Sequence, residues 1–265
     1  MNPILLTPRD LAVSALLLVL DAALSLALRL GLHRQLGIAA VRMVVQLLVV
    51  GVILRRVFDA ASPALTLAVV MLMAAIAARE VAARPEQQLG RFGNLTVAGS
   101  AVAGAACLTA VFALTTAIRP VPWYDPRYAV PLAGIILGNV LNAASLALDS
   151  LLGSVVRERA AVEAQLALGA TFGTAMARLA RQAIRRGMLP MINQMSAAGV
   201  VTLPGIMTGQ ILAGMDPMEA VKYQILLMFL LAGGGALASV VAVLLAVRLL
   251  TDPRQRLRLD RLRPR

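Results

Sequence analysis

The sequence is poor in the residues that build disulfide frameworks, metal clusters and nucleotide sites. Only 14% of its 265 residues are charged and 3% are aromatic. Its single cysteine, Cys107, excludes an intrachain disulfide framework and a thiolate metal cluster. Its single lysine, Lys222, stands between Val221 and Tyr223 rather than after a glycine-rich run, so the phosphate-binding loop of an ATPase is excluded.

Apolar residues fill most of the chain instead. They make up 60% of it, more than in soluble domains, and run on for lengths that cover a hydrocarbon core of about 30 Å. The sequence therefore predicts an all-α fold, a polytopic transmembrane helical bundle that occupies residues 1–265 as one domain. Seven spans are predicted, near residues 11–30, 36–54, 63–78, 95–118, 128–152, 188–214 and 223–247. The third is the shortest and needs flanking residues or local thinning of the bilayer to cross.

The basic residues predict orientation rather than nucleic-acid binding. The net charge is +12, but the arginines stand between apolar runs and few aromatic residues accompany them. Most of them fall in residues 153–187 and in a basic tail, 248–265. Because positive segments stay on the cytoplasmic side, seven spans place the C-terminus in the cytoplasm and the N-terminus outside.

Residues 153–187 form the longest segment between predicted spans, and their composition predicts helices rather than a flexible linker. Strong helix formers run from Glu158 to Leu166, and Gly169 follows as a helix end. Arg178, Arg181 and Arg185 then share one face of a second amphipathic helix. The segment is either a cytoplasmic helix with a mechanical role or a charged loop that rests on lipid headgroups.

Polar residues recur within two predicted spans. Gly138, Asn142, Ser145 and Asp149 fall on one helical stripe. Such a stripe offers oxygen ligands for the passage of a hard cation, or it serves helix packing through small residues and interhelical hydrogen bonds.

The span near 188–214 is rich in both polar residues and helix breakers. Pro190, Gly199 and the Pro204–Gly205 pair interrupt it, which predicts exposed carbonyls along a pathway and a hinge at Pro204–Gly205. The predicted translocation pathway therefore combines the two spans, through Asn139, Asn142, Ser145, Asp149, Asn193, Gln194, Thr202, Pro204, Gly205 and Gln210.

Two further charges are predicted to lie at membrane depth. Asp21 and Arg42 can pair across the first two spans, since an unpaired charge in the bilayer is costly. A structural ion pair is the preferred interpretation. Together with Asp149, they are also the residues that a transporter or channel working alone could use as ion relays.

A short motif predicts contact with an ATPase. The run EAQLALG at 163–169, followed by Leu189–Pro190, resembles the EAA motif of ABC importer permeases. Two departures are the glutamine at 165 in place of an alanine and a Leu-Pro pair that comes too late, so the importer docking geometry cannot be assumed. A short helix that ends at glycine can still carry the movement of an ATPase into the attached spans. The coupling residues predicted here are Arg157, Glu158, Glu163, Ala164, Gly169 and Ala170.

Longer motifs resemble one family along nearly the whole chain. The runs RMVVQL at 42–47, GNVLNAASL at 138–146, RER at 157–159, LGAT at 168–171 and LPGIMTGQILAG at 203–214 are similar to those of the FetB/YbbM family. That family consists of permease subunits of iron-export ABC transporters and includes plant subunits linked to aluminium tolerance.

The resemblance implies a division of labour between subunits. It implies a homodimer in the bacterial inner membrane, paired with two copies of a separate ATPase that uses ATP, and a role in exporting iron or a related metal ion. This chain would then hold no cofactor and catalyse no reaction, and the residues that bind the metal stay unassigned. An intramembrane enzyme is disfavoured, because one histidine without a partner cluster makes no catalytic site.

Overall fold

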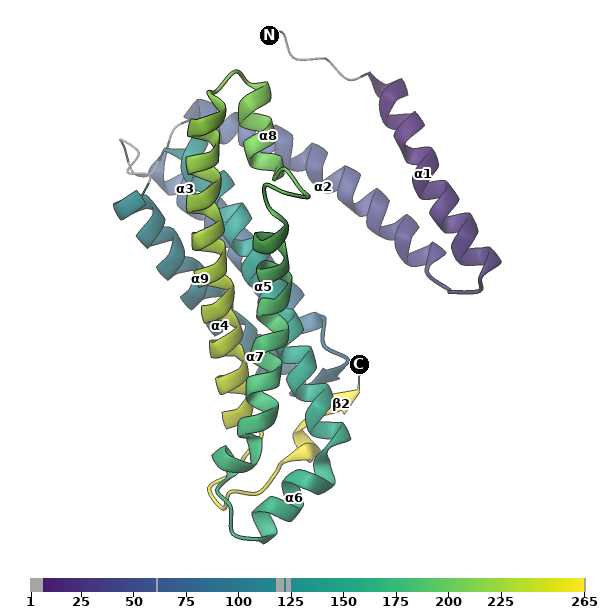
Figure 1. Cartoon of the computed structure of the whole chain (residues 1–265), viewed down its shortest axis with the longest axis vertical. Helices are drawn as coiled ribbons and strands as arrows, with labels where there is room; N and C mark the ends of the chain where they lie inside the picture. Colours follow the sequence, from purple (N-terminus) through teal and green to yellow (C-terminus); the bar gives the residue numbers. More distant parts are fainter. Residues whose placement is uncertain (1–6, 61, 118–121, 123–124, 265) are drawn as a thin grey trace. The chain divides into compact units, whose positions relative to one another are not determined.

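The structure, a computed structural model, describes residues 7–60, 62–117, 122 and 125–264. It divides into two compact units (Figure 1). One comprises residues 1–61 with 212–214, and the other comprises residues 62–211 with 215–265.

The first unit is a helical hairpin of α1 (Pro8–Ala27) and α2 (His33–Ala60). A capping box starts α1, because the Thr7 hydroxyl accepts from the Asp10 amide at 3.4 Å and the Asp10 carboxylate accepts from the Thr7 amide at 2.7 Å. The turn between the helices is closed by the buried Ser25, whose hydroxyl accepts a hydrogen bond from the Leu32 amide at 2.9 Å.

The second unit is a bundle of long helices around α5 (Figure 1). Along the chain come α3 (Pro63–Ala83), β1 (Gln87–Gln88), α4 (Gly90–Phe112) with a π-helical turn over Ala113–Ala117, α5 (Pro126–Arg157), α6 (Arg159–Ala167), α7 (Phe172–Ala197), α8 (Gly205–Leu212), α9 (Pro217–Leu249), a 3₁₀ turn over Leu259–Arg261 and β2 (Arg263–Pro264). α5 packs against α3, α4, α7 and α9, which makes it the centre of the core.

Glycines let the central helices approach closely. A methyl group on Gly187 of α7 would lie 2.5 Å from the Ser239 hydroxyl of α9 and 2.7 Å from the Ala143 carbonyl oxygen of α5. Gly234 and Gly235 of α9 likewise lie against Thr109 of α4 and Asn139 of α5. Small residues at helix interfaces are how membrane helices gain close contact without a hydrophobic driving force.

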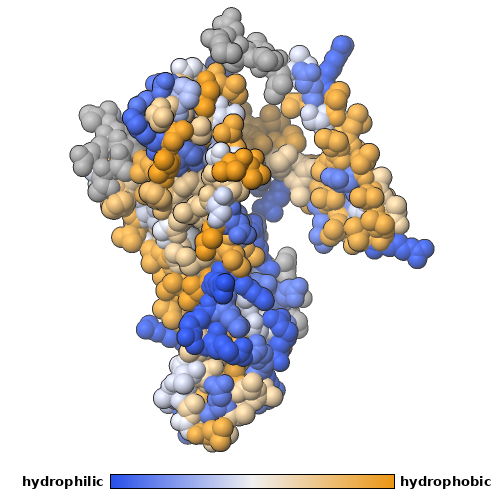
Figure 2. Space-filling view, in the orientation of Figure 1, coloured by the Kyte–Doolittle hydropathy of each residue, from blue (hydrophilic) through white to orange (hydrophobic). Residues whose placement is uncertain are grey.

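The predicted membrane spans are confirmed in kind and corrected in detail. Among the residues that the structure describes, six helices are long and apolar enough to cross a membrane, and they lie within α1, α2, α3, α4 with its π turn, α5 and α9. The third, α3, has 21 residues rather than the short run predicted, so it needs no thinning of the bilayer. Figure 2 shows hydrophobic residues over much of the visible face of α9 and hydrophilic residues gathered nearer the α6 end.

The predicted span near 188–214, expected to be interrupted, is divided between two helices. Its first part is the end of α7, which begins at Phe172, and Ala198 to Pro204 separate α7 from the short α8. Pro190 does not interrupt α7. Proline removes one helical hydrogen bond, but α7 runs on through Pro190, and Gly187 and Met191 on either side of it are buried. α7 is not one of these six helices, because Arg178, Arg181, Arg185 and Arg186 make it more polar.

The predicted boundaries of the segment 153–187 change accordingly. α5 continues to Arg157, and α7 already starts at Phe172, so only residues 158–171 lie between the two long helices.

Candidate coupling and translocation sites

The predicted coupling residues lie together at the end of α5, on α6 and in the turn before α7. α6 is a nine-residue helix, and only Val162 among its residues is buried. Its end needs glycine: Gly169 has a φ of +88°, a left-handed conformation that side chains with a Cβ rarely adopt. The Ala170 amide then donates to the Gln165 carbonyl at 3.0 Å and closes the turn. The sequence prediction of a separate short helix here is confirmed.

Ion pairs and hydrogen bonds order α6 and the junction before it, and one of them reaches α7. Arg157 donates to the Ser154 hydroxyl at 3.1 Å in the last turn of α5. Glu158, between α5 and α6, forms an ion pair with Arg178 of α7. On α6 itself, Glu163 pairs with Arg159 at 2.8 Å, and 46% of the Glu163 side chain is exposed. Charged groups of α6 thus remain available to a partner.

The basic tail is folded, which the sequence reading missed. After α9 the chain turns back, and β2 pairs antiparallel with β1, with Gln87 opposite Pro264 and Gln88 opposite Arg263. The Gln255 side-chain oxygen accepts from the Phe172 amide at 2.7 Å, at the start of α7. The tail therefore contacts both the α3–α4 connection and the start of α7.

Asp252 organises the turn of the tail. Its carboxylate accepts from the amides of Arg254 and Arg256, each at 3.0 Å. The hydrogen bond from the Arg256 amide is the main reason that the pKa of Asp252 lies below its ordinary value. Farther on, Arg258 donates two hydrogen bonds to Asp260, at 2.8 and 2.7 Å, and lowers the pKa of that carboxyl to about 2. Aspartates such as Asp252 and Asp260 favour such turns, but no local pattern indicates where the tail docks.

The polar residues of α5 contact several different neighbours, and their place on a pathway stays a prediction. Asn139 donates to the Leu231 carbonyl of α9. Asn142 accepts from Arg84 at 3.0 Å, and Asp149 accepts from the Glu86 amide at 3.0 Å, both just after α3. Ser145 is buried, and its hydroxyl makes no hydrogen bond within the described residues. The bonds of Asn142 and Asp149 hold the α3–α4 connection against α5.

The other predicted pathway residues lie around the break between α7 and α8. Asn193 and Gln194 are exposed near the end of α7. In the break, Gly199 has a φ of +83° and donates to the Thr202 carbonyl at 2.9 Å. Pro204 ends the break and Gly205 begins α8, on which the side-chain oxygen of Gln210 is buried without a hydrogen bond to any described residue. The predicted break is confirmed, and a hinge motion stays a prediction.

Asp21 lies on α1 and Arg42 on α2, two helices that contact each other within the first unit. Their ion pair stays a prediction. In the described part of the chain, no group of three or more histidine, cysteine, aspartate or glutamate side chains could hold a metal ion.

Comparison with known proteins agrees with the predicted resemblance. The profile of an uncharacterised protein family, UPF0014, matches residues 8–250. A UPF0014 membrane protein of Synechocystis is 38% identical over 244 residues, 90% of this chain and 92% of the relative. The probable iron export permease protein FetB of Escherichia coli is 32% identical over 257 residues, 97% of each chain. ALUMINUM SENSITIVE 3 of Arabidopsis thaliana is 26% identical over 235 residues, 88% of this chain and 84% of the relative.

No solved structure matches the chain. The family assignment therefore comes from sequence, with the apolar helices of the fold in agreement. With a match over most of its length and relatives above 30% identity along nearly the whole chain, the protein is a member of the UPF0014 family of membrane proteins.

Proposed function

We propose that this chain is the transmembrane permease subunit of an ABC transporter that exports iron or a related metal ion. A separate ATPase, in two copies, would dock on α6, and two copies of this chain would form the pathway in a bacterial inner membrane. The FetB relative, named a probable iron export permease, supports the cargo and direction.

The observation that carries the proposal is the construction of α6. It is short, mostly exposed, ended by Gly169, and attached to α5 directly and to α7 through the Glu158–Arg178 pair. A displacement of α6 is transmitted to α5 and α7, because the ion pair and the short connections restrict independent movement of α6. This is the mechanical requirement of a subunit that uses the ATP hydrolysis of a partner.

The test reverses one charge on α6. Glu163→Arg replaces an exposed carboxylate and places two arginines at i and i+4 on the helix. With the ABC ATPase encoded nearest to this gene, the unchanged chain should copurify and support ATP-dependent export of iron from loaded cells. Glu163→Arg should lose both properties while it still reaches the membrane.

A matched control lies at the start of α9. Glu219 is 54% exposed and pairs with Lys222 at 2.6 Å, so Glu219→Arg makes the same charge change in a similar pair. It should keep ATPase binding and export. If both variants behave alike, or if the chain transports metal with no ATPase present, the proposed function is wrong.

The alternative is a transporter or channel that works alone through Asp21, Arg42 and Asp149. Asp149 already accepts a hydrogen bond from the Glu86 amide, which gives it a structural task. Ion flux in vesicles that contain only this chain, abolished by Asp21→Asn, would favour the alternative over the ABC permease.

A further inference from the structure

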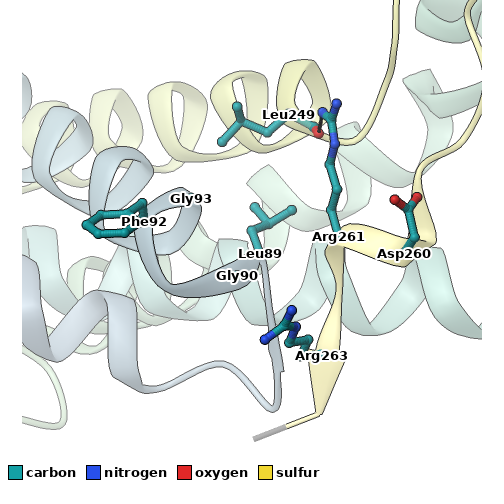
Figure 3. Close-up of a pocket in the computed structure, with 8 residues that line it drawn as sticks. All are labelled: Leu89, Gly90, Phe92, Gly93, Leu249, Asp260, Arg261 and Arg263. Carbon is teal, nitrogen blue, oxygen red and sulfur yellow. Dashed lines mark hydrogen bonds between the residues drawn. The ribbon is translucent and has the colours of Figure 1, made fainter.

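A pocket of about 470 Å³ lies where the folded tail meets the ends of two long helices. Its walls come from the start of α4, the end of α9 and the tail (Figure 3), and its chemically distinctive residues are Leu89, Phe92, Leu249, Asp260, Arg261 and Arg263. None of these residues belongs to the proposed coupling or translocation sites.

Two helices that are long and apolar enough to cross a membrane each have one end at the pocket. One candidate span begins at Phe92, and another ends at Leu249. Both residues line the pocket, so apolar spans extend from it on one side and the polar tail on the other. In a bilayer this is the depth of the phospholipid headgroups.

The charges in the pocket favour an anion. Arg261 uses Nη1 to donate to the carbonyl oxygens of Leu249 at 2.6 Å and Thr251 at 3.2 Å, which holds this guanidinium beside the end of α9. The exposed Arg263 makes no side-chain hydrogen bond or ion pair to any residue that the structure describes. Asp260 opposes an anion, but its carboxylate already accepts two hydrogen bonds from Arg258.

The apolar wall distinguishes a lipid from a free anion. Phe92 is 77% exposed, although it starts an apolar span. An inorganic anion has no use for an exposed aromatic ring, whereas the glycerol and upper acyl carbons of a phospholipid cover such a ring at the interface. Basic pockets beside transmembrane helices are a recurrent setting for anionic headgroups.

We propose that this pocket binds the headgroup of an anionic phospholipid, with Arg263 against the phosphate and Phe92 against the glycerol and upper acyl chain. A bound lipid would then bridge α4, α9 and the tail. The proposal depends on membrane insertion and on the folded tail, but not on the transport function proposed above.

The test measures phosphatidylglycerol and phosphatidylcholine bound to the full-length protein by native mass spectrometry. The unchanged protein should retain phosphatidylglycerol in preference to phosphatidylcholine. Arg263→Gln should lower the affinity for phosphatidylglycerol about fivefold, the effect of one arginine near an anionic headgroup, and leave phosphatidylcholine unchanged. Its unfolding temperature should stay the same, since β2 pairs with β1 through backbone groups.

Arg254→Gln is the matched control. Arg254 lies in the same tail, is exposed and does not line the pocket. Its substitution therefore removes the same charge outside the pocket. It should leave the binding of phosphatidylglycerol unchanged. An equal loss in both variants would overturn the pocket in favour of a general attraction of the basic tail.

Phe92→Ala with inorganic phosphate separates the two anion sources. It should weaken the binding of phosphatidylglycerol, and phosphate at millimolar concentration should not displace the lipid. If phosphate displaces the lipid and Phe92→Ala has no effect, the pocket is a site for a free anion and the lipid proposal fails.

Discussion

The middle of the α5–α7–α9 bundle and its α6 end are held together by different interactions. In the middle, the Ala143 carbonyl oxygen lies against Gly187 and the Asn139 side chain lies against Gly235, so neither glycine leaves room for a methyl group. At the α6 end, exposed ion pairs such as Glu158–Arg178 join the same helices. The middle should therefore be sensitive to added volume, and the end to altered charge. A closely packed middle with a less tightly packed α6 end suits a bundle on which a partner protein acts at the α6 end.

The largest expected effect is at the middle. Gly187→Ala places a Cβ 2.5 Å from the Ser239 hydroxyl, 2.7 Å from the Ala143 carbonyl oxygen and 2.9 Å from the Ala147 Cβ. The carbonyl belongs to the α5 backbone and cannot rotate away, so we expect a loss of about 1–3 kcal/mol in the free energy of unfolding. Titration with a denaturing detergent, followed by circular dichroism, measures it.

Gly233→Ala is the control for this loss. Nothing lies within 4 Å of a Cβ at Gly233, and alanine favours a helix over glycine by about 1 kcal/mol. The control should be as stable as the unchanged protein or more stable. Equal destabilisation by both variants would show that close packing is not what distinguishes the middle.

A smaller effect is expected where the tail docks on the α6 end. Asp252→Asn removes the charge of a carboxylate whose side chain is only 8% exposed and which pairs with Arg256 at 3.3 Å. The turn should loosen, and trypsin should cleave after Arg254 and Arg256 several-fold faster, with α9 intact. Glu219→Arg, far from the tail in sequence, should leave the cleavage rate unchanged. Unchanged cleavage of the Asp252→Asn variant would mean that the pairing of β1 with β2 alone holds the tail.

The docked tail should also respond to acid. The pKa values of Asp252 and Asp260 are lowered, so both carboxylates stabilise the fold fully above their ordinary pKa of 3.8. That contribution is lost as the pH falls through the lowered values, which for Asp260 is about 2. Hydrogen exchange of the tail amides, corrected for intrinsic rates, should be constant from pH 7 to pH 5 and then rise toward pH 2. A rise centred near neutral pH would contradict this assignment.

The same contrast explains what the sequence could predict. The apolar helices and α6 depend on composition and on Gly169, which are local, and both predictions are confirmed. The predicted break at Pro190 is wrong: the residue type marks a lost hydrogen bond, but it does not show that Gly187 nearby packs against α5 and α9, a contact between distant segments. The tail was missed for the same reason: Gln255 meets Phe172 and β2 meets β1 across long stretches of chain.

The smallest expected effect on stability is at the charged pairs of the α6 end. Glu158–Arg178 is partly exposed, with 33% of the Glu158 side chain accessible, so Glu158→Gln should change the free energy of unfolding by less than about 1 kcal/mol. If α6 is the lever proposed here, the same variant should still bind the ATPase but couple it poorly, with ATP hydrolysed at the normal rate and metal export reduced. Arg178→Gln removes the other partner and should give the same defect, whereas the double variant should be no worse than either single one, because one pair is lost in all three. Additive defects in the double variant would mean that the two residues act separately, and the ion pair would then not be the link between α6 and α7.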